Sequence, residues 1–165
     1  MIRPALAWPD KRLKTPAAPV EEITEEIRAI WDDMVETMDA MPGYGLGGPQ
    51  IGVMLRLAVV DCSEERGQAI RLANPEILHA SVKLRAHEEA SPNLPGVSAA
   101  IERPRAVTVR FLNEAGEVEE RDFVNLWATS VQHQIDHLDG KMYFDHLSRL
   151  KRERLLKRAA KLGRG

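Results

Sequence analysis

Apolar residues recur along the chain at two different periods, and each period predicts one type of element. Between residues 21 and 41 they return every three or four positions, which is the period of one helix face. We therefore expect a helix over 21–41 whose apolar stripe packs into the core. The stripe consists of Ile23, Ile27, Ile30, Trp31, Met34, Met38 and Met41.

Alternating apolar residues in the middle of the chain predict strands. The alternation covers 55–62, 69–77 and 106–113. The tetrapeptide NEAG at 113–116 has the composition of a hairpin turn, so a return strand is expected over 118–124.

Two further helices are expected near the C-terminus. One covers 125–138 and is stopped by Gly140, which favours a helix end. The other covers 148–162, with Ser148 as its N-cap.

The remaining segments are rich in proline and glycine. The segment PGYGLGGPQIG at 42–52 cannot continue a helix and must be a loop or an extended segment. The N-terminal arm should be irregular, because four prolines punctuate it: Pro4, Pro9, Pro16 and Pro19. The whole pattern predicts one α+β domain over 1–165, with strands in the middle and helices flanking them.

The composition is that of a globular protein rather than a disordered one, with 44% hydrophobic and 29% charged residues. Apolar stretches fall far below the roughly 18 residues that cross a bilayer, and no apolar segment of a secretory signal is visible at the N-terminus. Cys62 is the only cysteine, which rules out an internal disulfide and suits a reducing compartment. We expect a cytoplasmic protein that does not contact membranes.

The net charge of −2 is unevenly distributed. Residues 149–165 contain eight basic residues and one acidic residue, Glu153, while the rest of the chain is acidic. A basic amphipathic tail on an acidic body can bind RNA or an acidic partner. Composition alone favours the alternative, a solvated helix face whose cations suit the C-terminal end of the helix dipole.

Three stretches carry candidate chemistry. His133 and His137 are four residues apart on a predicted helix, so both imidazoles face one side, where they can hold one metal ion. In metal hydrolases with this spacing the residue after the first histidine is a glutamate that acts as general base, but here it is Gln134. The other two stretches are the glycine-rich GYGLGGPQ (43–50) and EEASPNLPG (88–96).

Taken together and in this order, the three stretches resemble the motifs of the peptide deformylases. That family carries G-x-G-L-A-A-x-Q, E-G-C-L-S and Q-H-E-x-D-H-L-x-G, where this chain reads GYGLGGPQ (43–50), EASPN (89–93) and QHQIDHLDG (132–140). The likeness extends over essentially the whole chain. It implies an α+β deformylase fold with antiparallel or mixed sheets around a central HxxxH helix, and with a C-terminal helix.

The resemblance implies hydrolysis of the N-formyl group from the initiator methionine of new bacterial proteins. In that chemistry two histidines and a cysteine hold a divalent metal, usually iron or zinc, and a glutamate moves the proton. A glutamine amide and a backbone N–H hold the oxyanion. By position, the two histidine ligands are His133 and His137, and the oxyanion glutamine is Gln50. Gly45 and Leu46 match the loop that contacts the substrate.

The departures from the family pattern fall on the catalytic groups. Ser91 stands at the cysteine ligand and is a doubtful ligand, because an alcohol ionises far less readily than a thiol. Pro92 follows it and has no N–H to donate. Gln134 stands at the glutamate. Three lesser departures lie nearby: Ser98 replaces the usual arginine, Gly47 and Gly48 replace paired alanines, and Tyr44 is bulkier than usual.

No replacement catalyst is evident. Asp136 matches a residue of active members, so it is not a spare base. Glu88 or Glu89 could ligate a metal, although paired carboxylates in such a position are more often structural. Cys62 is expected in the core. His79, His87 and His146 are expected at the surface or in a second layer.

Two classes of function follow. The first is a deformylase-like protein without metal chemistry that binds nascent-chain N-termini, the ribosome through its basic C-terminal helix, or another protein. The second is a weakly active deformylase, or a hydrolase whose coordination is remodelled around His133, His137 and a water or carboxylate. We expect no metal or a weakly bound divalent ion, and no specific DNA binding. A nucleic-acid regulator is supported only by the basic tail.

Overall fold

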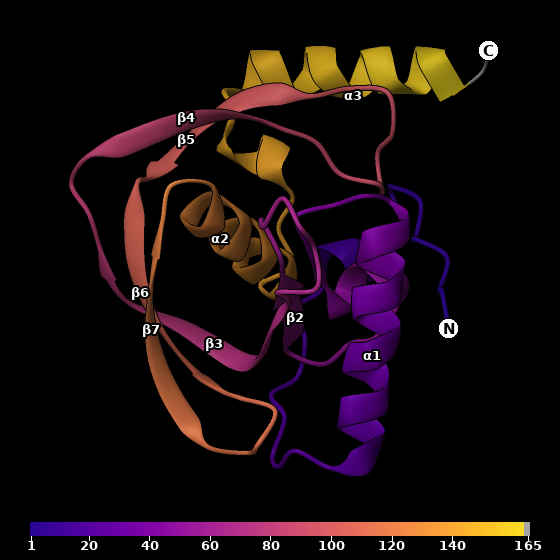
Figure 1. The fold of residues 1–165 in the computed structure, drawn as a ribbon. Coiled ribbons are helices and arrows are strands. Elements are labelled where there is room, and N and C mark those ends of the chain that lie inside the picture. The colour runs from indigo at the N-terminus through magenta and orange to yellow at the C-terminus, as the bar shows by residue number, and fades with distance from the viewer. Residues whose placement is uncertain (164–165) are drawn as a thin grey trace.

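A computed structural model describes residues 1–163 of the chain. It contains three α-helices, seven strands and three short 3-10 turns (Figure 1). The helices are α1 (Glu25–Ala40), α2 (Leu126–Leu138) and α3 (Arg149–Gly163), and the turns are η1 (Lys11–Lys14), η2 (Gly48–Ile51) and η3 (Tyr143–His146). The strands are β1 (Gly45–Gly47), β2 (Leu57–Val60), β3 (Ile70–Ala80), β4 (Leu84–Glu89), β5 (Ala99–Pro104), β6 (Ala106–Leu112) and β7 (Val118–Val124).

The strands form two sheets. Five of them pair in the order β1-β2-β3-β6-β7, and β4 pairs with β5 in a separate two-stranded ribbon. Every pairing between these strands is antiparallel. Helix α2 lies in the middle, with the ribbon above it and the curved five-stranded sheet around it (Figure 1). The predicted α+β class with a central HxxxH helix and a C-terminal helix is confirmed.

Most elements predicted from periodicity are present, with shifted ends. Helix α1 begins at Glu25 rather than near residue 21, because the Thr24 hydroxyl caps it by accepting a hydrogen bond from Ile27 N at 3.2 Å. The 113–116 turn joins β6 to β7, as expected. The 42–52 segment is part extended and part helical turn, as β1 and η2.

Strands β4 and β5 were not predicted from the sequence. Their segments, LRAHEE and AAIERP, lack the apolar alternation that marks a half-buried strand. Two of the residues that they bury are the charged Glu89 and Arg103. A buried ion pair does not appear in a hydrophobic pattern, so this ribbon is visible only in the tertiary structure.

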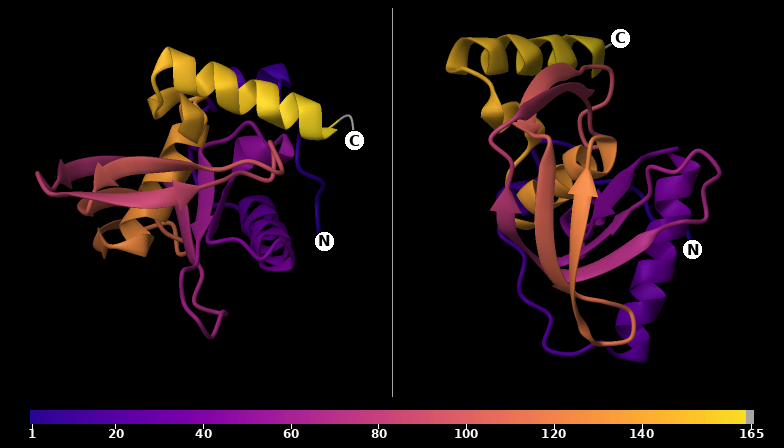
Figure 2. Two further views of the ribbon diagram at one scale, coloured as in Figure 1. Left: turned by 90° about the horizontal axis from the view of Figure 1, so that it is seen from above. Right: turned by 60° about the vertical axis from the view of Figure 1, so that its left-hand side comes forward.

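Apolar side chains gather in three clusters, and α1 covers the first of them. Trp31, Met34 and Met38 are fully buried against β1, β2 and β3, which confirms the predicted stripe. A second cluster lies between α2 and the strands β3, β6 and β7. The third lies beneath α3, which lies across the outer side of the β4–β5 ribbon (Figure 2). No helix within residues 1–163 is both long enough and apolar enough to cross a membrane.

The glycine-rich segment allows close packing against its neighbours. A Cβ atom on Gly45 would lie 2.6 Å from Gln134 Nε2 and 2.7 Å from Ser130 Oγ, so a side chain there would collide with α2. A Cβ on Gly48 would lie 2.6 Å from the carbonyl oxygen of Val53 and 2.9 Å from that of Leu55. Both positions therefore need glycine, because neighbouring atoms pack where a Cβ would lie.

We predict that Gly48→Ala destabilises the protein, because the added methyl meets backbone atoms that cannot move alone. Overpacking of this kind costs about 1–3 kcal/mol, and about 2–4 °C of Tm accompanies each kcal/mol at this chain length. Thermal unfolding followed by circular dichroism measures the effect. Gly43→Ala is the control, since its added Cβ would meet no atom closer than 3.6 Å. Equal melting temperatures for the two variants would contradict this account.

Candidate active site

The two motif histidines converge at the centre of the molecule. Helix α2 buries His133 and His137, with 8% and 1% of their surface exposed, and their Nε2 atoms lie 3.2 Å apart. The spacing of one helical turn places both rings on the same face. Two nitrogen atoms at this separation share one proton or bind one common ligand.

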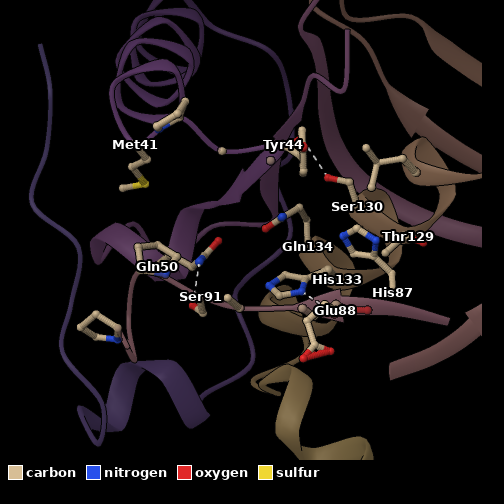
Figure 3. Close-up of a pocket in the computed structure, with 18 of the residues that line it drawn as sticks. Met41, Tyr44, Gln50, His87, Glu88, Ser91, Thr129, Ser130, His133 and Gln134 are labelled. Carbon is tan, nitrogen blue, oxygen red and sulfur yellow. Dashed lines mark hydrogen bonds and ion pairs between the residues drawn. The ribbon is translucent and has the colours of Figure 1, made fainter. Parts of the chain in front are cut away.

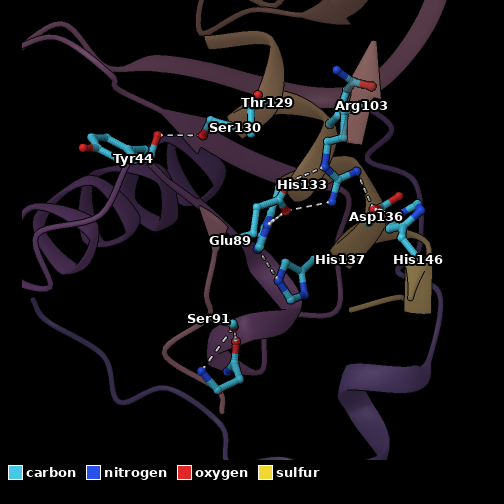
Figure 4. A network of polar contacts seen from close by, with 12 residues as sticks. Tyr44, Glu89, Ser91, Arg103, Thr129, Ser130, His133, Asp136, His137 and His146 are labelled. Carbon is cyan, nitrogen blue, oxygen red and sulfur yellow. Dashed lines mark hydrogen bonds and ion pairs between the residues drawn. The ribbon is translucent and has the colours of Figure 1, made fainter. Parts of the chain in front are cut away.

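A buried charge network sets the orientation of His133 (Figure 4). The Nδ1 of His133 lies 2.7 Å from a carboxylate oxygen of Glu89 in β4. Arg103 in β5 donates two hydrogen bonds to the same carboxylate, at 2.7 and 2.9 Å, and a third to Asp136 at 2.8 Å. His146 in η3 contacts Asp136 at 2.7 Å. The network joins the β4–β5 ribbon, α2 and η3 at one point.

The protonation states follow from these contacts. Burial raises the pKa of Glu89, but hydrogen bonds from His133 and Arg103 outweigh it, so the pKa lies below its ordinary value. The same balance, with His146 and Arg103 as partners, lowers the pKa of Asp136. Burial, together with the neighbouring His133, holds the pKa of His137 well below its ordinary value. Both carboxylates are therefore ionised at neutral pH, and His137 is neutral.

The residue at the family's cysteine position takes part in a closed set of hydrogen bonds. Ser91 Oγ donates to Asn93 Oδ1 at 3.0 Å, and Gln50 Nε2 donates to the same oxygen at 2.9 Å and to Ser91 Oγ at 3.4 Å. The side-chain nitrogen of Asn93, Nδ2, donates to the backbone carbonyl oxygens of Leu6 and Gln50, at 2.7 and 3.0 Å. Asn93 thus joins the N-terminal arm, η2 and the β4–β5 connection.

Gln134 is the residue of this site whose side chain lacks partners. It is 4% exposed, its Oε1 is buried without a hydrogen-bond partner, and its Nε2 donates to no atom of residues 1–163. The nearby Ser130 hydroxyl does not satisfy it, because that hydroxyl donates to the carbonyl oxygen of Tyr44 at 2.9 Å.

These groups surround one cavity of about 400 Å³ (Figure 3). Five of the seven sequence-predicted site residues line it: Gly45, Gln50, Ser91, His133 and Gln134. The other two do not line it: Leu46 is buried in the core, and His137 is buried within α2's packing with 1% of its surface exposed. Pro92 lines the cavity without an N–H to offer.

Two further histidines and the cysteine lie at different distances from the cavity. His87 lines the cavity wall, although we expected it at the surface or in a second layer. His146 does lie in a second layer, behind Asp136. Cys62 packs against the second cluster, where burial raises the pKa of its thiol to about 12. It lies outside the cavity lining and stays protonated, so it supplies no thiolate there.

Sequence reasoning missed the importance of Asn93 and Arg103. Asn93 lies within the second motif and gave a weak signal, as a polar residue where the family has serine. Arg103 lies in β5, outside the three motifs, and its three carboxylate hydrogen bonds depend on the unpredicted β4–β5 ribbon.

An antiparallel α+β fold that buries an HxxxH helix beside a cavity, with a Glu–His pair and a glutamine loop next to it, has the arrangement of a metal-hydrolase fold. Comparison with known proteins makes the family explicit. The polypeptide deformylase family model matches residues 2–153. The chain belongs to the peptide deformylase family.

Individual relatives agree with this assignment. A peptide deformylase of Afipia carboxidovorans is 44% identical over 97% of this chain and 95% of that one. A crystal structure of a peptide deformylase from Legionella pneumophila superposes with a TM-score of 0.93 at 38% identity, covering 99% and 96% of the two chains. A class I type b peptide deformylase from Acinetobacter baumannii with Met-Ala-Ser bound has a TM-score of 0.83 at 29% identity, covering 89% and 99%.

The metal that this family implies does not fit the donor set present in the chain. The Ser91 hydroxyl gives its proton to Asn93, and within residues 1–163 no three His, Cys, Asp or Glu residues are grouped to hold an ion. The histidine pair supplies only two nitrogen atoms, 3.2 Å apart, and Glu89 is engaged with His133 Nδ1 at 2.7 Å.

His137 Nδ1 is buried and has no hydrogen-bond partner within residues 1–163. Histidines that ligate metals almost always donate their second N–H to a partner. We therefore derive no chemical step through a metal ion in this chain.

We predict that Arg103→Met lowers the free energy of unfolding at pH 7 by about 3–5 kcal/mol, because it leaves the buried carboxylate of Glu89 and the partly buried one of Asp136 without their cation. Chemical denaturation measures the loss. Arg110→Met is the control, since Arg110 and its partner Glu76 are largely exposed, and its effect should stay within about 0.5 kcal/mol.

The free energy of unfolding of Arg103→Met should also fall less on acidification than that of the native protein. Glu89 and Asp136 have lowered pKa values in the folded protein, so their contribution is present above the unfolded value of roughly 4 and is lost as the pH falls below it. Removal of Arg103 raises the pKa values of both carboxylates, so less stability is lost between about pH 5 and pH 3. An unchanged acid profile in Arg103→Met would contradict the role given to the network.

Proposed function

We propose that this protein binds peptide N-termini in the central cavity and hydrolyses their formyl amide negligibly or not at all. The observation that carries the proposal is the closed set of hydrogen bonds among Ser91, Asn93 and Gln50. It occupies the two positions from which an active member would supply a metal ligand and an oxyanion donor.

Each substitution removes a separate part of the hydrolysis. Ser91 offers a hydroxyl in place of a thiolate, Pro92 offers no backbone N–H, and Gln134 cannot carry a proton. Loss of one oxyanion donor reduces a rate by about 10²–10³-fold, and loss of general acid–base catalysis reduces it by about 10²–10⁴-fold. Together these losses bring the rate close to the uncatalysed one.

Gln50, which stands at the family's oxyanion position, already has protein partners for its side-chain amide. Gln50 Nε2 donates to Asn93 Oδ1 at 2.9 Å and lies 3.4 Å from Ser91 Oγ, and its Oε1 accepts from Gly47 N at 2.9 Å. A ligand oxygen would have to displace one of these buried hydrogen bonds. Retention of Gln50 therefore does not preserve its role.

Binding of a peptide is supported by the cavity itself. Its volume of about 400 Å³ suits a few residues of an extended peptide. Apolar side chains, among them Met41, Val97 and Leu126, line part of the wall. The Acinetobacter baumannii relative holds Met-Ala-Ser in the same fold.

A second candidate function is a weakly active hydrolase with remodelled metal coordination, and the 3.2 Å separation of the histidine Nε2 atoms favours it. Two ligands of one tetrahedral ion lie at about this separation. A third ligand is harder to find. Glu89 already binds Arg103 and His133, and Glu88 is exposed on the opposite face of β4.

We predict that the purified protein contains far less than one metal ion per chain and releases negligible formate from formyl-Met-Ala-Ser, even with added zinc or iron. Elemental analysis and a formate assay measure the two results. About one chelator-resistant ion per chain, or robust turnover that is abolished by His133→Ala, would support the second candidate instead.

Restoration of the family residues tests the same proposal from the opposite direction. The triple variant Ser91→Cys, Pro92→Leu and Gln134→Glu should recover metal binding and some activity, whereas Gln134→Glu alone should recover little. Addition of Asn93→Ser should raise activity further, because it frees Gln50 Nε2. Equal activity of the triple and quadruple variants would contradict the blocking role of Asn93.

A further part of the proposal concerns helix α3, through which the protein would contact the ribosome or RNA. Helix α3 buries Leu155 and Ala159 and exposes most of its basic residues, among them Lys151, Arg154, Lys157 and Arg158. Its acidic residue, Glu153, is paired with Arg149 at 3.0 Å. The exposed face is therefore strongly positive.

We predict that the protein sediments with ribosomes at low salt and is released as the salt concentration rises, because phosphate contacts depend on released counterions. Lys157→Gln with Arg158→Gln should weaken sedimentation by several-fold. A matched control, Arg28→Gln with Arg110→Gln, removes equal charge far from α3 along the chain. No sedimentation of the native protein would leave α3 as an ordinary solvated face.

A further inference from the structure

Strand β7, orange in Figure 1, is the last strand of the five-stranded sheet, where it pairs with β6 and with no other strand of residues 1–163. Just beyond it, Asn125 N donates to the carbonyl oxygen of Arg105 at 2.9 Å, so odd-numbered residues face β6. The alternation of an antiparallel ladder then turns the N–H and C=O groups of Glu120, Asp122 and Val124 toward the free edge. Onto such groups a further strand can pair.

Grooves flank this edge on both faces of the sheet. On the inner face, a groove of about 520 Å³ is lined by apolar side chains of Ile70, Phe123 and Trp127. On the outer face, a groove of about 370 Å³ is lined by Thr108 and Val124. Successive side chains of a strand point to opposite faces, so those of an added strand would enter the two grooves in turn. Neither groove shares a lining residue with the central cavity.

The charges along the outer face are complementary to one pattern of side chains. A third groove, of about 500 Å³, continues the outer one past Val124 and is lined by Lys83 and Arg105. Neither cation forms an ion pair within residues 1–163. The exposed carboxylates of Asp122 and Glu120 come next along this face of β7. An antiparallel strand with a carboxylate first, and with cations two and four residues later, would match these charges.

We propose that the free edge of β7 is a docking surface for an extended segment of another protein, which adds to the sheet as an antiparallel strand. The segment carries a carboxylate at its N-terminal end, opposite Val124 and beside Lys83 and Arg105. Cations follow on the same face, and apolar side chains on the other face fill the inner groove. This surface lies outside the central cavity, so docking there does not depend on the function proposed for the cavity.

A second copy of the chain is a poorer occupant of the same edge. When two β7 strands pair antiparallel through their middles with the outer faces together, Glu120 and Asp122 of one copy lie opposite the same two carboxylates of the other. Like charges directly opposite one another destabilise a pair of strands. The edge therefore resists pairing with itself and accepts a segment of the complementary charge pattern.

The test adds the hexapeptide acetyl-Glu-Val-Lys-Val-Lys-Val-amide to the isotope-labelled native protein and follows the amide chemical shifts. Changes should saturate in β7 and in the 63–70 segment, with a dissociation constant of about 1 mM or below. Methylation of the backbone nitrogen of the first lysine removes an N–H directed at β7 and should weaken binding about fivefold. Methylation of the next valine nitrogen is the matched control, because that N–H faces solvent, and affinity should change by at most about twofold.

A charge exchange tests the orientation of the peptide. Arg105→Glu should weaken binding of the hexapeptide several-fold, and a peptide with lysine in place of its glutamate should bind this variant more tightly than it binds the native protein. Lys141→Glu is the control, since it makes the same change of charge beyond the opposite end of α2. It should alter both affinities by at most about twofold. Circular dichroism confirms that both variants are folded.

Several results would overturn the proposal. One is the absence of saturable shift changes in β7, and another is a set of changes confined to the central cavity. Equal affinities of the two methylated peptides would show that binding does not use the β7 ladder. Equal effects of Arg105→Glu and Lys141→Glu would remove the charge complementarity. A dimer of the native protein in sedimentation equilibrium, with the β7 amides protected from hydrogen exchange, would place a second copy on this edge instead.

Discussion

The structure depends on how one buried guanidinium is neutralised. Arg103 is 4% exposed, and its charge is tolerated because Glu89 and Asp136 surround it with three hydrogen bonds. These carboxylates in turn hold His133 and His146. The ribbon of β4 and β5, helix α2 and turn η3 are therefore joined at one point, and the cavity lies between elements whose positions this network sets.

The network explains how the fold of a deformylase can persist when its chemistry is altered. Glu89 is hydrogen-bonded to Nδ1 of His133, and no contact of this network involves Ser91, Pro92 or Gln134. All three of these residues line the cavity. Asn93 supplies there a set of uncharged hydrogen bonds that ties the β4–β5 connection to η2 and the N-terminal arm.

Periodicity located the elements that bury an apolar stripe. Helix α1 was visible because Trp31, Met34 and Met38 follow the helical period. Strand β6 was visible from its alternation, and β7 from the turn that follows β6. The β4–β5 ribbon was not, because part of what it buries is charge. A hydrophobicity pattern does not show which carboxylate pairs with which guanidinium.

The sequence by itself determined which chemical groups the site can contain. The chain has no thiol at position 91, no backbone N–H at 92 and no carboxylate at 134, so no conformation can place these groups in the site. Only the tertiary structure decided how the remaining groups are used. Gln50 and Asn93 are 43 residues apart along the chain, and their hydrogen bond leaves Gln134 as the unpaired amide of the cavity. Partners of this kind depend on distances that folding alone creates.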